Sequence, residues 1–288
     1  MDIIPQLILN SVIAGAIYTS VALGFNLIYG TAKFSNLAHG VIAAIGGYAV
    51  FYLTKTLNLN VYIAIILGVT LAGLVGWASN KFIYLPLRKR KASNMILFIA
   101  SLGVMTALQA IIAMLFSSQF KTLSQDIGTQ KLFKIFGGVI TQTQVIILSS
   151  TIFIIAGLAL LLYKTRFGKA VRAINDDEEA AQIIGINTNK IIGLVFFIGS
   201  AIAGLAGILI GFDTGIEPTM GLDLLFKGMV TSIIGGAGNI YGGILGGFLI
   251  GFVENFSIWR ISGEWKDAIV FMLLIVFLIF RPRGIINK

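Results

Sequence analysis

Long apolar segments alternate with short polar ones along this 288-residue chain. The apolar runs fall at residues 7–29, 37–53, 61–79, 95–117, 144–163, 191–212, 224–258 and 267–280. Most are close to the roughly 20 residues that a helix needs to cross a bilayer. This pattern predicts an all-α, polytopic integral membrane protein with about eight or nine transmembrane or re-entrant helices.

The run at 224–258 is the ambiguous one, because GGAGNIYGG at 235–243 interrupts it like a turn. The break leaves about 12–15 residues on either side, and at 1.5 Å per residue each arm reaches only about 18–22 Å. The hydrocarbon core is about 30 Å thick. We therefore expect a hairpin of two short or re-entrant helices, with its irregular backbone surrounded by protein or a watery cavity.

Composition supports the membrane assignment. The chain is 57% hydrophobic and 11% charged, with a mean hydropathy of +0.94, values outside the range of soluble domains. A net charge of +9 would suggest nucleic acid as a partner in a soluble protein. Here we expect no nucleic-acid partner, since basic residues belong in cytoplasmic loops beside anionic lipid. The absence of cysteine excludes disulfides, thiolate catalysis and cysteine-based metal sites.

The basic residues gather in the segments 81–91, 164–190 and 281–288. The positive-inside rule places all three in the cytoplasm. Because three apolar runs precede the first basic segment, the N-terminus is expected outside and the C-terminus inside. The first run is too long for a signal peptide, so we interpret it as a retained span.

The second basic segment contains an unusual acidic stretch, NDDEEAAQIIGINTNK at 175–190. An amphipathic helix is predicted just before it, with Phe167, Val171 and Ile174 on one face. Asn175 or Asp176 is a plausible N-cap for a second helix of about two turns, and Gly185 stands where a left-handed C-cap belongs. Two turns are unstable alone in water, so this helix packs either on the protein's own loops or in a groove of a partner.

Several motifs carry a family resemblance. EAAQIIG at 179–185 matches the Glu-Ala-Ala-x-x-x-Gly core by which permeases of ABC importers contact their ATPases, although the usual hydrophobic-Leu-Pro ending is replaced by VFFI at 195–198. Together with other segments, this loop resembles the branched-chain amino acid permeases of bacterial and archaeal ABC importers, specifically the shorter, LivH-type subunit. These segments are ALGFNLIYG at 22–30, FSNLAHG at 34–40, GKAVRAINDDEEAAQIIGIN at 168–187, GGAGNIYGGILGG at 235–247 and FRPRGI at 280–285.

The resemblance implies one permease domain over residues 1–288, in the cell membrane, with a cytoplasmic coupling loop at 164–190. It implies two ABC ATPase subunits, a second permease subunit (a sister chain or a copy), an extracytoplasmic solute-binding protein and the lipid bilayer as partners. No cofactor and no enzymatic activity are expected, since ATP would be bound by the partner ATPases; the chain has no G-x-x-x-x-G-K-[ST] phosphate loop. The residues that match the coupling segment are Asp177, Glu178, Glu179, Ala180, Ala181 and Gly185.

Other residues are candidates for lining or gating a pathway: Asn36, His39, Gly235, Gly236, Gly238 and Glu254. Each also has a structural interpretation. His39 could be a hydrogen-bonded packing residue, Glu254 could pair with Arg260 near the outer surface, and the glycines could serve tight packing. A single histidine does not suggest a metal site, and we predict no catalytic residues.

Three functions remain open at this level. The favoured one is a permease for branched-chain or similar small hydrophobic amino acids. A permease of the same family for urea or a short amide is the first alternative, because close relatives share these motifs. An ion-coupled secondary carrier, for which Glu254 would be the buried carboxylate, is the second. A membrane-embedded enzyme is less favoured, since no catalytic set of side chains is evident.

Overall fold

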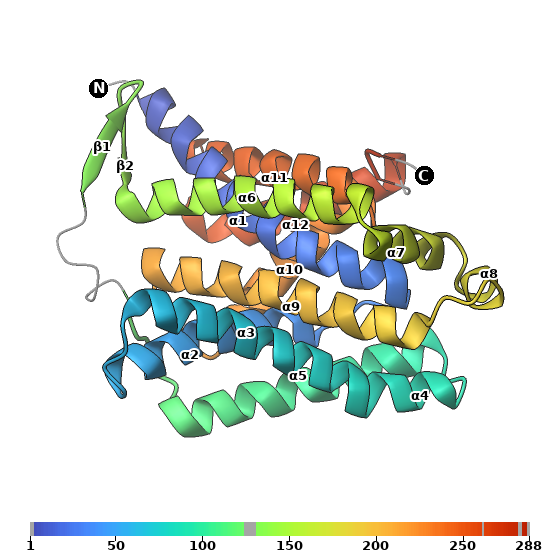
Figure 1. The fold of residues 1–288 in the computed structure, drawn as a ribbon. Helices are drawn as coiled ribbons and strands as arrows, with labels where there is room; N and C mark the ends of the chain where they lie inside the picture. The colour runs from blue at the N-terminus through green and yellow to red at the C-terminus, as the bar shows by residue number, and fades with distance from the viewer. Residues whose placement is uncertain (1–2, 124–130, 261, 282–283, 287–288) are drawn as a thin grey trace.

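The structure, a computed structural model, describes residues 3–123, 131–260, 262–281 and 284–286. Long helices lie side by side in a bundle, with short helices and a small β-hairpin at its two ends (Figure 1). The elements are α1 Ile3–Ala32, α2 Ala38–Lys55, α3 Val61–Ser79, η1 Asn80–Tyr84, α4 Leu85–Lys89, α5 Asn94–Phe116, β1 Leu132–Ile135, β2 Gly138–Thr141, α6 Gln142–Lys164, α7 Arg166–Asp176, α8 Glu178–Ile183, α9 Thr188–Asp213, α10 Met220–Gly235, α11 Ile240–Arg260, η3 Gly263–Trp265 and α12 Lys266–Phe280.

Six helices in the described part of the chain are long and apolar enough to cross a membrane. They are α1, α3 together with its continuation to Lys89, α5, α6, α9 and α11. The remaining long helices are shorter, with 18 residues in α2, 16 in α10 and 15 in α12. The prediction of an all-α polytopic membrane protein is thus confirmed in its broad form.

Local capping explains why several predicted boundaries are close to the observed ones. The Asn60 side chain accepts a hydrogen bond from the Tyr62 amide at the start of α3. Thr141 and Gln144 form a capping box at the start of α6, in which each side chain bonds the other residue's backbone amide. Such caps satisfy amides that the first helical turn leaves unpaired, so these starts are encoded in a few neighbouring residues.

The centre of the bundle is built from helices that approach at small residues. α9 packs against α1, α2 and α3, and α11 packs along α1. A side chain on Gly207 of α9 would overlap the backbone of Ala43 in α2, and Gly46 is equally close to Gly204. Such contacts let helix backbones touch in an apolar medium. Within their most apolar windows, α1 and α9 are each 61% buried, whereas α5 is 17% and α6 22% buried.

The described parts of the three basic segments lie at one end of the bundle (Figure 1). α4, α7 and α8 gather there with the end of α12, while the start of α1 and the β-hairpin lie at the opposite end. We call these the inner and outer ends, after the orientation that the positive-inside rule predicts. The sequence predicts that all three basic segments lie on the same side of the membrane, and their position at one end of the bundle agrees with this. The hairpin, which was not predicted, pairs Leu132 with Thr141 and Ile135 with Gly138, and Gln6 of α1 bonds both backbone groups of Val139.

The predicted pair of short arms over 224–258 is wrong for one arm. α10 has 16 residues, but α11 has 21, and the turn between them occupies only residues 236–239. Gly242 and Gly243 looked like part of a turn, yet they are helical. They lie where α11 meets its neighbours, and a side chain on Gly242 would overlap the backbone of Gly235. Glycine here provides close packing, which the sequence pattern does not distinguish from a turn.

Candidate functional site

The segment 164–190 forms two successive helices at the inner end. α7 is amphipathic as predicted, with Val171 and Ile174 buried, and it packs on α6, α1 and α9. The Thr165 hydroxyl accepts a hydrogen bond from the Gly168 amide at 3.0 Å and so begins the helix. α7 continues to Asp176, and this fixes where the next helix can start.

The predicted short acidic helix is α8, Glu178–Ile183. Its N-cap is Asp177, whose carboxylate accepts from the Ala180 amide at 3.0 Å. The cap is therefore not Asn175 or Asp176, because both still belong to α7. Glu178 and Glu179 occupy the first turn, where carboxylates complement the helix dipole. Gly185 adopts a φ of +88°, the left-handed conformation expected of it.

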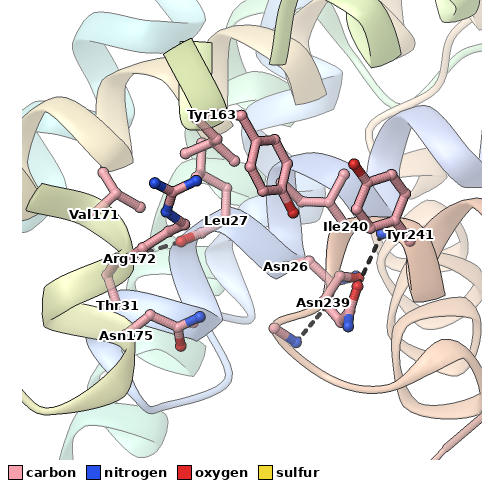
Figure 2. A pocket seen from close by; sticks show the side chains of 13 residues that line it. Asn26, Leu27, Thr31, Tyr163, Val171, Arg172, Asn175, Asn239, Ile240 and Tyr241 are labelled. Atoms are coloured by element: carbon pink, nitrogen blue, oxygen red, sulfur yellow. Dashed lines mark hydrogen bonds between the residues drawn. The ribbon is translucent and has the colours of Figure 1, made fainter. Parts of the chain in front are cut away.

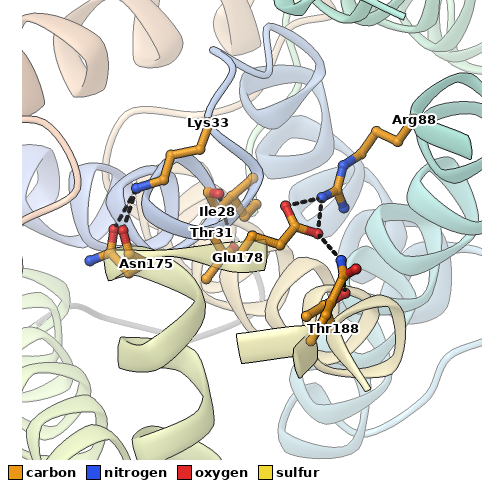
Figure 3. Close-up of polar contacts among 8 residues, drawn as sticks. Ile28, Thr31, Lys33, Arg88, Asn175, Glu178 and Thr188 are labelled. Carbon is orange, nitrogen blue, oxygen red and sulfur yellow. Dashed lines mark hydrogen bonds and ion pairs between the residues drawn. The ribbon is translucent and has the colours of Figure 1, made fainter. Parts of the chain in front are cut away.

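Glu178 is held from the side by a residue of another loop (Figure 3). Arg88 of α4 donates to both carboxylate oxygens of Glu178 at 2.6 Å. Gln182 bonds Glu178 at 3.4 Å and the Thr188 hydroxyl of α9 at 3.1 Å. Sequence reasoning missed Arg88; the only signal available was that one loop was basic and the other acidic. The ion pair ties α8 to the helix that continues from α3.

A second polar contact connects α7, the helix that precedes α8, to the end of α1. Lys33, just after α1, donates to the backbone oxygen of Asn175 at 2.5 Å and to its side-chain oxygen at 3.1 Å (Figure 3). α7 and α8 are therefore attached to α1 and α4 through side chains, and to α6 and α9 through the chain itself.

The outward face of α8 is apolar. Ile183 is 85% and Ile184 73% exposed, although this short helix belongs to the basic, polar end of the bundle. Glu179, Ala180 and Gly185 are exposed beside them. We call these five residues the coupling surface, after the coupling segment that the sequence predicts here. Ala181 was expected to share this face, but it is buried against the protein itself at 2% exposure. Exposed apolar side chains grouped in this way mark an interaction site.

Asn36 and His39 are buried where α1 turns into α2. The Asn36 side-chain oxygen accepts from the Tyr84 hydroxyl at 3.0 Å and from the Ala38 amide at 3.2 Å. His39 has its Nε2 3.3 Å from the Val21 carbonyl, and its ring lies against Gly24. Both side chains join helices within the bundle in this arrangement.

Glu254 of α11 lies in a buried ionic cluster. It is fully buried, accepts from the Tyr18 hydroxyl at 2.8 Å, lies 3.4 Å from the Lys227 ammonium and forms an ion pair with Lys266. Lys227 also pairs with Asp267 at 3.6 Å. The expected partner Arg260 has a side chain outside the described residues. This cluster joins α1, α10, α11 and α12.

The turn between α10 and α11, which contains Gly236 and Gly238, lies beside the end of α1 at the inner end of the bundle. Asn26 of α1 holds the turn: its side chain accepts from the Gly238 amide at 2.9 Å and donates to the Asn239 carbonyl at 3.0 Å. The chain's last described residues also pair with the end of α10, since Ile285 donates to the Ile234 carbonyl at 2.8 Å.

These candidates do not form a single site. Asn36 and His39, the α10–α11 turn and Glu254 each have separate partners at different heights of the bundle. In the described ranges, no group of three or more His, Asp or Glu side chains is arranged to hold a metal ion. The coupling surface is the feature that points most clearly to a partner.

Comparison with known proteins bears on the whole chain. A family described as "Branched-chain amino acid transport system / permease component" matches residues 7–278. The chain is 31% identical to the high-affinity branched-chain amino acid transport system permease protein BraD of Pseudomonas aeruginosa, with 98% of this chain and 95% of that protein covered. It is 31% identical to LivH of Escherichia coli K12, a permease described in the same words, over the same shares.

An archaeal relative and a solved structure extend the likeness. A probable branched-chain amino acid transport permease protein LivH of Methanocaldococcus jannaschii is 30% identical, with 99% of this chain and 93% of that protein covered. PsaBC from Streptococcus pneumoniae, solved in complex with a Fab, aligns with a TM-score of 0.51 at 15% identity, covering 98% of this chain and 93% of the other. At that identity the likeness concerns the fold alone.

Proposed function

Because the chain belongs to the branched-chain amino acid transport system permease family, we propose that it forms part of the transmembrane pathway of an ABC importer for branched-chain amino acids. It works in the cytoplasmic membrane with its inner end in the cytoplasm. ATP is bound and hydrolysed on two separate ATPase subunits. A second permease subunit completes the pathway, and an extracytoplasmic binding protein delivers the substrate to the outer end.

The coupling surface carries this proposal. α8 has only six residues, and it ends on two exposed isoleucines, Ile183 and the C-cap Ile184, which a partner would cover. The Arg88–Glu178 pair fixes the inward side of α8, so that Glu179, Ala180, Ile183 and Ile184 face outward toward a groove on the ATPase. Recognition of a short apolar helix in a groove is a common mode of protein association.

The contacts of α8 indicate how motion would spread. A shift of α8 acts on α9 through residues 184–187 and on α3 through Arg88. α9 is central and packs on α1, α2 and α3. Closure of the ATPases thus tilts the core of the bundle and exposes the pathway to each side in turn. Asp177 and Gly185 keep α8 a separate rigid unit.

The substrate follows from the relatives, whose names specify branched-chain amino acids. The urea and amide alternative has no such support. The ion-coupled carrier would need a carboxylate that takes up and releases a proton. Glu254 is instead paired with Lys227 and Lys266 and bonded by the Tyr18 hydroxyl, contacts that fix its carboxylate within the bundle.

An Ala180→Glu variant tests the proposal. Ala180 is exposed, so the variant folds and inserts normally, but its larger charged side chain prevents α8 from seating in the ATPase groove. Uptake of labelled leucine into cells falls to background while the protein level in the membrane is unchanged. Asn189→Glu is the matched control, since Asn189 is exposed on the first turn of α9 and the charge change is the same. Normal leucine uptake by Ala180→Glu would contradict the proposal.

A further inference from the structure

A cavity of about 120 Å³ lies at the inner end, away from the coupling surface and beside the α10–α11 turn that Asn26 holds. Its walls come from four segments: the end of α1, the end of α6, the middle of α7 and the α10–α11 turn (Figure 2). One water molecule needs about 10–15 Å³ measured in this way. The cavity therefore has room for a solute of several heavy atoms. We call it the inner cavity.

One wall of the inner cavity suits an anion. Arg172 of α7 lines it, with its guanidinium 4.9 Å from the centre of the Tyr163 ring. Arg172 forms no salt bridge within the residues that the structure describes. No aspartate or glutamate is among the residues that line the cavity, and Asn26, Asn175 and Asn239 supply its other polar side chains. A partly buried guanidinium without a carboxylate is suited to bind one from a ligand, because its planar fork matches carboxylate geometry.

Another wall of the inner cavity is apolar. Leu27, Leu162, Val171 and Ile240 give the cavity an aliphatic wall. The Tyr163 and Tyr241 rings are 6.0 Å apart, and these residues are 46% and 49% exposed, so they form the rim through which a solute enters. Phenol and amide oxygens can accept hydrogen bonds from an ammonium group. The Arg172 guanidinium can bind a ligand's carboxylate, and the aliphatic wall beside it can pack against an apolar side chain. Together they fit a small apolar amino acid.

We propose that the inner cavity binds such an amino acid from the cytoplasmic side, with its carboxylate on Arg172, and that this binding slows the transport cycle. The inference rests on the proposed function, which supplies the orientation and the class of solute. The ligand is thus the transported product, sensed after its release.

The position of the inner cavity explains why a bound ligand would slow the transport cycle. α7 leads directly into α8, whereas the α10–α11 turn is held by Asn26 and by the pairing of residues 285–286 with 234–235. A ligand in the cavity contacts both sides of this joint. It stabilises the arrangement seen here and opposes movement of α7 relative to the turn, because a ligand favours the conformation that binds it best. With one ion pair and a few further contacts we expect a Kd on the order of 1 mM.

The test uses the complete transporter in proteoliposomes. Binding protein and labelled leucine are trapped inside, and ATP is added outside, so that only transporters with outward-facing ATPases work. Unlabelled leucine added on the ATP side should lower both ATP hydrolysis and the initial rate of labelled leucine release, by half near its Kd. Leucinol, which lacks the carboxylate, should have no effect at the same concentration.

Variants assign the effect to the cavity. Arg172→Gln should keep the rate measured without added leucine and become at least tenfold less sensitive to leucine. Arg166→Gln is the matched control, because Arg166 is exposed on the same helix and does not line the cavity; its sensitivity should equal that of the wild type. Inhibition that is equal in Arg172→Gln and wild type would overturn the proposal.

Two further results separate the outcomes. Glycerol 3-phosphate and inorganic phosphate, added in place of leucine, test whether Arg172 binds a lipid phosphate instead; inhibition by these and not by leucine would also overturn the proposal. Failure to release any labelled branched-chain amino acid would refute the proposed function. The inner cavity is then tested on its own by equilibrium dialysis of labelled leucine with the purified permease and Arg172→Gln, where equal binding would refute it.

Discussion

Paired charges stabilise both ends of the bundle, but the two groups of charges differ in how deeply they are buried. Toward the outer end, where α12 begins, Glu254 is completely buried between Lys227 and Lys266, whose side chains are 18% and 37% exposed. At the inner end the Arg88 and Glu178 side chains are 16% and 27% exposed. Buried charges cannot be left unpaired, so the outer cluster fixes its helices in one arrangement. Both partners of the inner pair are partly exposed, so this pair can break and re-form more easily, as the proposed movement of α8 requires.

Removing the buried carboxylate should have the largest effect on stability. Glu254→Gln leaves Lys266 without its counter-charge and Lys227 with Asp267 alone. Loss of one partner from a buried ion pair costs about 3–5 kcal/mol, and the partial exposure of the lysines places this variant near about 3 kcal/mol. The measurement is the thermal unfolding midpoint of the purified protein in detergent.

Glu264→Gln is the control for this experiment, because Glu264 is exposed just before α12. Its effect should stay within about 0.5 kcal/mol, as for most surface substitutions. Equal midpoints for Glu254→Gln and Glu264→Gln would show that the buried cluster does not stabilise the outer end, and the contrast between the two ends would be lost.

The two lysines should differ from each other by a smaller amount. Each single replacement by Met leaves Glu254 with the other lysine, so the loss is about 1–3 kcal/mol, typical of a hydrogen bond to a charged group. Lys227→Met should cost more than Lys266→Met, because Lys227 is the less exposed of the two and also pairs with Asp267 at 3.6 Å. The same unfolding midpoints decide this order, and the reverse order would contradict the assignment by exposure.

The inner pair should show the smallest effect on stability and a clear effect on activity. Arg88→Gln should change the free energy of unfolding by about 1 kcal/mol, because this pair is partly exposed on both sides while Glu254 is completely buried. It should also lower leucine transport per ATP hydrolysed, since α8 is no longer tied to the helix that continues from α3. The exchange Arg88→Glu with Glu178→Arg should restore part of this ratio. An unchanged ratio in Arg88→Gln would mean that the pair is not part of the coupling.

The sequence alone predicts the elements whose causes are local. Apolar length locates most helices to within a few residues, and caps such as Asn60 and the Thr141–Gln144 box define starts that depend on adjacent residues. The same holds for α8, where Asp177, the following acids and Gly185 occupy consecutive positions. Basic segments also predicted which loops share one end.

What could not be predicted depends on contacts between distant residues. Asp223 lies just before the apolar run at 224–258, yet α10 already starts at Met220, and Lys227 in its second turn pairs with Glu254 and Asp267. Arg88 is 90 residues from Glu178, and Asn26 is 212 from Gly238. The direction in which Ala181 faces depends on the tilt of α8 against α9. No periodic pattern encodes such pairings.

The glycines show where this protein could be made sturdier for laboratory work. Most of those in the central helices face a neighbour at backbone distance, and even one added methyl group would force helices apart. Gly103 of α5 and Gly157 of α6 are different, since an added Cβ there meets nothing within 4 Å in this chain. Alanine at these two positions would lower the conformational entropy of the unfolded chain without changing the core. Each substitution should raise the free energy of unfolding by about 0.4–1 kcal/mol. The peripheral helices α5 and α6 can therefore be stabilised while α7, α8 and the α10–α11 turn keep their native sequence.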